Sequence, residues 1–181
     1  MNTTYSNQNL SLKKLITSGV CLALCLLLPF LTGQIPQIGS MLSPMHIPVL
    51  ICGLACGWPY GLIIGFIAPI FRSLLFGMPP LFPTATAMAF ELASYGAISG
   101  ILYKLLPKKV IFLYTSLVGA MLFGRIIWGI TMVVLMGFTG GAFTFQAFVA
   151  GAFANAIPGI ICHILIIPPI VLGLKKAKLT N

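Results

Sequence analysis

Acidic residues are almost missing from this sequence. Glu91 is the single carboxylate side chain among 181 residues, and charged residues as a whole make up 6% of the chain. One carboxylate cannot supply the pair that aspartyl proteases use, and no HExxH motif offers a metalloprotease site. No GxxxxGK[ST] motif is present for binding ATP through a P-loop. We therefore expect a protein that is not an enzyme and that needs no cofactor or metal of its own.

Long apolar runs dominate instead. Hydrophobic residues make up 59% of the chain, and the mean hydropathy is +1.10. Soluble domains carry about 25% charged residues. The apolar runs are roughly 20 residues long, which is the length that crosses the hydrocarbon core of a bilayer. The sequence predicts an all-α integral membrane protein with a single membrane domain over residues 1–181.

Six membrane helices are predicted between breaks rich in glycine and proline. They cover residues 12–31, 46–56, 60–76, 85–106, 110–137 and 147–167, and Pro168-Pro169 is expected to interrupt the last one. The second is short enough to be tilted or only partly inserted. Residues 1–11 are expected to form a polar tail, and residues 174–181 a basic one.

The basic residues outside the spans fall in three regions. They are Lys13 and Lys14, then Lys104, Lys108 and Lys109, then Lys175, Lys176 and Lys178. With six spans these regions share one side of the membrane, and the positive-inside rule makes both termini cytoplasmic. The net charge of +9 therefore reflects orientation in the membrane rather than nucleic-acid binding. The three loops on the other side are uncharged and are expected to face outside.

Three ionisable residues remain inside predicted spans: Arg72, Glu91 and Arg125. Such residues are costly in a bilayer and mark functional sites by default. Glu91 pairs with one of the two arginines if the arrangement merely fixes helix packing, and the sequence leaves open which one. The other arginine then lacks an anion, which a ligand carboxylate or phosphate could supply. Arg72 lies near enough to the outer end to reach the interface, so Arg125 is the predicted ligand-facing residue.

Polar and aromatic neighbours extend this candidate site. Tyr95 follows Glu91 by one helical turn, and Trp128 follows Arg125 by three residues, so each pair shares a face. Asn155, the only asparagine within a span, can approach from the last helix. The pattern predicts a small-molecule site between the fourth, fifth and sixth helices, in the outer half of the membrane.

Further candidates come from the first outer loop. Gln34 and Gln37 could form a hydrogen-bonding lid, and His46 enters the second helix, where an ordinary interfacial histidine is the alternative reading. His163 is expected near the cytoplasmic end of the last helix, in a structural role. The two histidines would then lie near opposite membrane faces, so a serine hydrolase would lack its base.

Small residues and cysteines show two further patterns. Gly53, Gly57, Gly61 and Gly65 repeat every four residues, which permits close backbone approach within the bundle. Gly19 and Ala23 form a small-xxx-small pair on the first helix, where a partner protein could dock. The five cysteines all lie in apolar segments and are expected to act as small buried hydrophobes.

Three stretches carry a resemblance to a known family. They are LSPMHIPVLICGLACGWPYGLIIGFIAP, FRSLLFGMPPLFPTATAMAFELASYG and GRIIWG. Together with a short chain of six helices, cytoplasmic termini, basic inner ends and the small-xxx-small pair on the first helix, they resemble the S component of an energy-coupling factor (ECF) vitamin transporter, in the branch that contains pantothenate binders. The resemblance covers nearly the whole chain.

The resemblance implies a specific activity. Such proteins bind a vitamin from outside, using the first loop and helices four to six, and associate with a transmembrane coupling subunit and two ATPase subunits. ATP is used by those partners, in the bacterial plasma membrane. Gly19 and Ala23 are similar to the family's docking motif. A small anionic vitamin, with pantothenate favoured, is the predicted substrate.

Other functions stay open at this point. A neutral or cationic vitamin, such as a pyridoxine-like compound, a pyrimidine or riboflavin, would use Glu91 as its partner. A stand-alone small-molecule facilitator would need no ATPase. A structural protein would bind no ligand at all.

Overall fold

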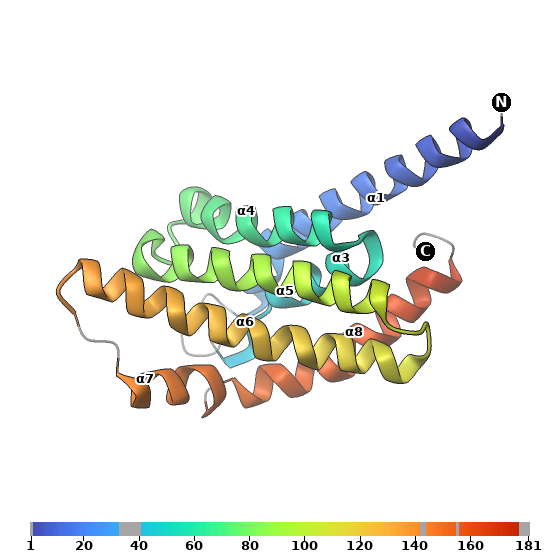
Figure 1. The fold of residues 1–181 in the computed structure, drawn as a ribbon. Coiled ribbons are helices and arrows are strands. Elements are labelled where there is room, and N and C mark those ends of the chain that lie inside the picture. The colour runs from blue at the N-terminus through green and yellow to red at the C-terminus, as the bar shows by residue number, and fades with distance from the viewer. Residues whose placement is uncertain (1, 33–40, 142–143, 155, 178–181) are drawn as a thin grey trace.

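The computed structural model describes residues 2–32, 41–141, 144–154 and 156–177. The helical elements are α1 (Asn2–Leu27), the 3-10 turn η1 (Leu28–Thr32), α3 (His46–Cys56), α4 (Trp58–Phe76), the π-helical turn η2 (Leu81–Ala85), α5 (Thr86–Leu105), α6 (Val110–Phe138), α7 (Phe145–Val149), the π-helical turn η3 (Ala150–Ala154) and α8 (Ile157–Lys176). They form an elongated bundle (Figure 1). No strand occurs among the residues described. The predicted all-α class is confirmed.

Within the described ranges, five helical segments are long and apolar enough to cross a membrane. They begin in α1, α4, η2, α6 and α7, and the last continues through α8. The second predicted span, α3, has only 11 residues, which is about 16 Å or half of a hydrocarbon core. The chain is therefore an integral membrane protein, while the count of six full spans stays a prediction.

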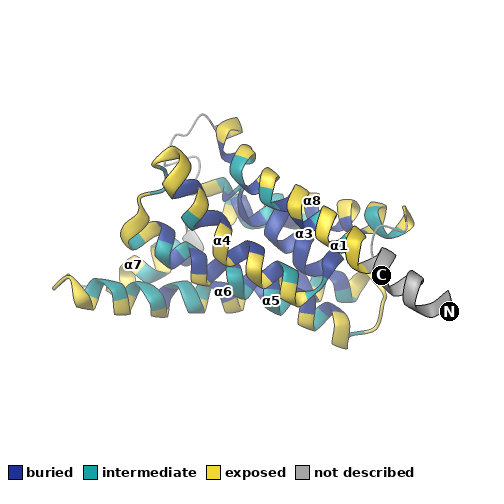
Figure 2. Cartoon of the chain, turned by 90° about the horizontal axis from the view of Figure 1, so that it is seen from above, coloured by how far each residue is buried: buried dark blue, intermediate teal, exposed yellow. Residues whose placement is uncertain are grey.

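The short helix α3 lies at the centre of the bundle. It packs against α1, α4, α5 and α8, and each of its residues except Ile47 is buried. The outer helices instead expose large apolar side chains, such as Leu105 and Leu165. In Figure 2 these exposed positions line the outside of the bundle, while α3 is almost wholly buried. A bilayer is the solvent that tolerates such an exterior.

Glycines let α3, α4 and α5 approach closely. A Cβ atom on Gly53 or Gly61 would overlap the carbonyl oxygen of Gly96, and one on Gly65 would overlap the backbone of α5. Gly57, with φ of 104°, turns the chain between α3 and α4, a conformation that glycine adopts without strain. The repeat of glycines every four residues therefore serves packing within this chain.

The predicted boundaries hold for the middle helices and differ at both ends. α1 begins at Asn2, so the described part of the predicted tail over residues 1–11 is helical. α8 continues through Pro168 and Pro169 to Lys176, and the break lies before it, at η3. The predicted interruption at the two prolines is wrong, because membrane helices can satisfy locally the backbone groups that proline frees.

The predicted basic regions lie at one end of the bundle. Both chain termini and the turn from α5 to α6 are at the same end in Figure 1. Lys13 and Lys14 in the first half of α1, the lysines of this turn and those at the end of α8 therefore lie towards that end, whereas η2 and α7 lie towards the opposite end. This grouping agrees with the sequence; that the basic end is cytoplasmic stays a prediction from the positive-inside rule.

Candidate functional site

Glu91 is the centre of a buried polar cluster. Its side chain is 2% exposed, and its Oε1 atom lies 3.0 Å from Nη1 of Arg125 and 3.5 Å from Nε2 of His46. Tyr95, one turn further along α5, interacts with the same carboxylate. Helices α3, α5 and α6 each contribute a residue, so the cluster joins three elements that are distant in sequence.

Local sequence explains how these side chains meet. Glu91 and Tyr95 are four residues apart on α5 and therefore share a face. Gly124 precedes Arg125 on α6, and a Cβ atom there would overlap the ring of Tyr95. The missing side chain lets the tyrosine ring pack against α6, which brings the neighbouring guanidinium to the carboxylate.

Arg125 is the arginine that pairs with Glu91. The sequence left this pairing open and predicted Arg125 as the residue with no protein anion. In the structure the Arg125 side chain is 12% exposed and its charge is balanced by the carboxylate. Buried charges need such a partner, since removing one member strands the other in a medium of low dielectric constant.

Arg72 is buried in a different environment. The side chain is 2% exposed, and its Nη1 donates a hydrogen bond to the carbonyl oxygen of Leu26. Its guanidinium carbon lies 4.8 Å from the ring centroid of Phe30 and 5.2 Å from that of Phe76, within cation–π range. These contacts join α4 to α1 and η1, so this arginine finds its partners inside the protein and away from the Glu91 cluster.

His163 joins the cluster from α8. Its ring stacks on that of His46 with centroids 6.0 Å apart, and its Nε2 lies 3.3 Å from the carbonyl oxygen of Ser43. The expectation that the two histidines lie near opposite membrane faces is wrong, because the last helix begins at Ile157 and reaches further along the chain than predicted. Proline in the first turn of α8 was the sequence signal for this later start.

Several polar atoms in the cluster have no hydrogen-bond partner among the described residues. They are Nδ1 and Nε2 of His46, Nε of Arg125 and Oε1 of Glu91, all shielded from solvent. Oε1 of Glu91 therefore attracts Arg125 and His46 electrostatically, but the angles at these contacts are not those of hydrogen bonds. Leaving a buried donor or acceptor unsatisfied costs about 1–3 kcal/mol. A ligand that offers both donors and acceptors would remove that cost.

An aromatic group flanks the cluster along α6. Trp128 stacks on Phe148 of α7 with centroids 6.4 Å apart, and a Cβ atom on Gly151 would press against the indole ring. Trp128 therefore contacts the segment that follows α6, and Phe148 is a neighbour that the sequence did not suggest. Gln146 is exposed on α7.

The remaining predicted residues are placed as follows. Gln34, Gln37 and Asn155 lie outside the described residues. Gly19 and Ala23 are exposed on α1, and a Cβ atom on Gly19 would meet nothing within 4 Å. Within the described part of the chain, no group of three or more histidine, cysteine or acidic residues could hold a metal ion.

Comparison with known families identifies the chain. The family model for the substrate-specific component of ECF transporters matches residues 13–171, which is most of the chain. Searches among curated proteins and among solved structures give no match. Among the described residues, the match overlaps each of the five helical segments that can span a membrane and includes every residue of the Glu91 cluster. The protein therefore belongs to the ECF transporter substrate-specific component family.

Proposed function

We propose that this protein captures a small vitamin from outside the bacterial plasma membrane and delivers it inward with an ECF coupling subunit and two ATPase subunits. The observation that carries the proposal is the buried cluster of Glu91, Arg125 and His46, whose unpartnered atoms suit a polar ligand. Glu91 lies in the second turn of α5, whereas Lys104 and the basic turn lie at the other end of that helix, and this placement supports entry from outside. ATP is used by the partners, and this chain needs no cofactor.

Pantothenate is the first candidate ligand. The resemblance of residues 42–69, 71–96 and 124–129 to pantothenate binders supports it. The ligand's carboxylate would approach the free Nε of Arg125, and its hydroxyl groups could donate to and accept from the ring nitrogens of His46. Gln34, Gln37 and Asn155 are proposed to complete the site.

A neutral vitamin is the second candidate, and a specific observation favours it. Because Glu91 balances Arg125, and Arg72 is held by a carbonyl oxygen and two aromatic rings, neither arginine needs a ligand anion. The argument from two arginines and one carboxylate therefore no longer favours an anion by itself. A neutral ligand would enter the cluster without adding an unbalanced charge.

Isothermal titration of the purified chain against a vitamin panel tests both candidates. The panel includes pantothenate, its neutral alcohol analogue, pyridoxine and riboflavin. We expect binding of one compound, weakened at least about tenfold by Arg125→Gln, since a hydrogen bond to a charged group contributes about 1.5–3 kcal/mol. Lys109→Gln, which removes an exposed charge at the other end, is the matched control and should leave the affinity unchanged.

The double variant Glu91→Gln/Arg125→Gln separates a ligand contact from a structural ion pair. It removes both charges and leaves no stranded ion. If it restores wild-type affinity, the pair only supports the fold and the proposed contact with Arg125 is wrong. Uptake by cells with and without the partner ATPases then distinguishes an ECF component from a stand-alone facilitator, since persistent uptake without them would contradict the proposal.

A further inference from the structure

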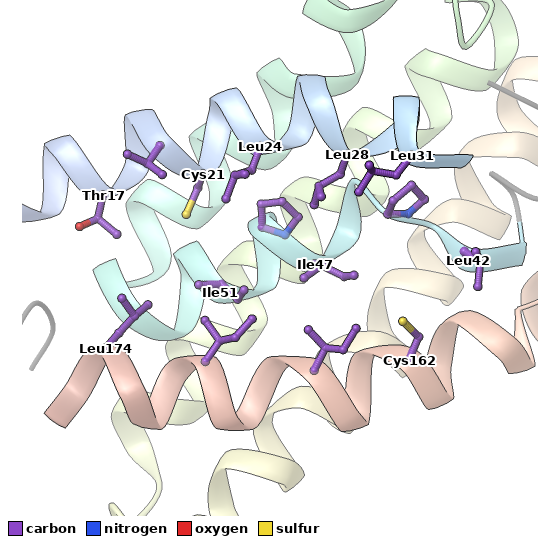
Figure 3. Close-up of a pocket in the computed structure, with 15 residues that line it drawn as sticks. Thr17, Cys21, Leu24, Leu28, Leu31, Leu42, Ile47, Ile51, Cys162 and Leu174 are labelled. Carbon is purple, nitrogen blue, oxygen red and sulfur yellow. The ribbon is translucent and has the colours of Figure 1, made fainter. Parts of the chain in front are cut away.

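An apolar groove lies on the side of α3 that faces away from the Glu91 cluster. Helices α1 and α8 form its walls and α3 its floor (Figure 3). Its volume is about 520 Å³, within the range of pockets that hold small organic ligands. It runs along α8 from Cys162 to Leu174, a length of roughly 18 Å.

The lining of the groove suits a hydrocarbon chain. Leucine, isoleucine, valine, proline and cysteine side chains make up nearly all of it, with Thr17 at one end. Vitamin sites need a few placed polar groups to orient a ligand, and the groove has no such convergence. Its length is close to half of the roughly 30 Å hydrocarbon core, which is the depth of one leaflet.

Lysines flank the end of the groove where Thr17 and Leu174 lie. Lys13 and Lys14 precede Thr17 by four and three residues and so lie on the same face of α1, one turn further out. Lys14 is partly buried, and its carbonyl oxygen accepts a hydrogen bond from Ser18 one turn further along α1. On the opposite wall, Lys175 directly follows Leu174.

The lysines of this end crowd one another. Lys108 in the turn between α5 and α6 lies over the ring of Tyr103, at 3.9 Å from its centroid. Burial and the nearby charge of Lys175 lower the pKa of Lys108 below its usual value. Glu91, the only acidic side chain, lies in the polar cluster, so no acidic side chain offsets these charges.

We propose that the groove binds an anionic phospholipid of the leaflet at the basic end. One acyl chain lies between α1 and α8, and the headgroup phosphate binds Lys13, Lys14 and Lys175. Charge complementarity selects the lipid, because basic clusters at helix ends attract anionic headgroups, and the apolar lining holds its chain. This inference goes beyond vitamin capture and depends only on the membrane setting of the helices.

Native mass spectrometry of the full chain in detergent tests the proposal. The protein is titrated with dioleoyl phosphatidylglycerol and, separately, with dioleoyl phosphatidylcholine, which has the same chains. We expect tighter binding of phosphatidylglycerol. Lys13→Gln/Lys14→Gln should weaken its binding roughly thirty-fold and leave phosphatidylcholine unchanged. Lys104→Gln/Lys109→Gln is the matched control, since it removes one lysine from α5 and one from the turn after it, neither of which lines the groove.

Adjacent residues of α8 test the groove itself. Ile166→Trp fills it, whereas Leu165→Trp places the same side chain on an exposed position outside it. We expect only the first to abolish binding of phosphatidylglycerol. If Ile166→Trp binds the lipid as well as Leu165→Trp does, the lysines attract headgroups without the groove and the proposal is wrong.

Cys162 provides a readout in the unaltered chain. It lines the groove and is partly exposed, so bound phosphatidylglycerol should slow its alkylation by N-ethylmaleimide, followed by peptide mass spectrometry. Equal alkylation with both lipids would overturn the proposal. So would protection of Cys162 that appears only when the coupling subunit is bound, because the groove would then hold a protein segment.

Discussion

Consecutive residues at the start of α3 face two different environments. His46 is buried against Glu91 and stacks on His163. Ile47 lines the apolar groove between α1 and α8. The same helix thus separates a polar cluster from a surface suited to hydrocarbon.

The polar cluster and the apolar groove need different interactions to be stable. The cluster needs charge balance and hydrogen bonds supplied at fixed positions, because water does not reach it. The groove needs only apolar contact, which a lipid chain supplies without any directional bond. Replacing a single charged or polar group should therefore destabilise the cluster strongly. Lipid binding in the groove should instead depend mainly on the size of the side chains that line it.

The largest expected effect is at Glu91. Glu91→Gln keeps the shape of the side chain but leaves the guanidinium of Arg125 without its counterion. We expect the free energy of unfolding to fall by about 3–5 kcal/mol, measured by titration with sodium dodecyl sulfate, and ligand binding to be lost. Adding Arg125→Gln should recover much of the stability. A single variant as stable as the wild type would show that the ion pair is not needed for folding.

A smaller loss is expected where α3 and α4 meet α5. Gly96→Ala would push a methyl group into the backbone of Gly61, which should lower the free energy of unfolding by about 1–3 kcal/mol. Gly19→Ala is the matched control, because the added methyl meets open space and alanine favours the helix, so stability should not fall. The same denaturant titration compares the two, and equal losses would contradict this view of the packing.

A substitution of Arg72 tests whether the two arginines inside the spans have different roles. Arg72→Met keeps apolar bulk but removes the hydrogen bond to Leu26 and the cation–π contacts with Phe30 and Phe76. We expect a loss of about 1–2 kcal/mol in stability and no change in ligand affinity. A fall in affinity matching that of Arg125→Gln would instead make Arg72 a ligand contact.

The smallest expected effect is at His163. Replacing His163 by phenylalanine keeps a ring that can stack on His46 but removes the polar contact with Ser43. His163→Phe should therefore cost about 1 kcal/mol of stability, with ligand affinity changed by less than in the Glu91 variant. A complete loss of binding would indicate that His163 contacts the ligand directly.

Much of the architecture followed from the sequence. Helix boundaries from His46 to Phe138 were close, because glycine, proline and the lengths of the apolar runs are local signals. The predicted last helix lies too early in the chain, because Pro168 and Pro169 predict a break whereas α8 continues through them. That error of position also hid the contact between the two histidines.

The sequence by itself determined that the chain is a helical membrane protein with its lysines in three separate regions, and that three ionisable side chains lie inside apolar helices. These properties depend on composition and on short-range periodicity. Only the tertiary structure decided that Glu91 pairs with Arg125, that Arg72 joins α1 to α4, and that His46 meets His163. Those choices depend on which helices are neighbours and how they are rotated, and no local pattern specifies either.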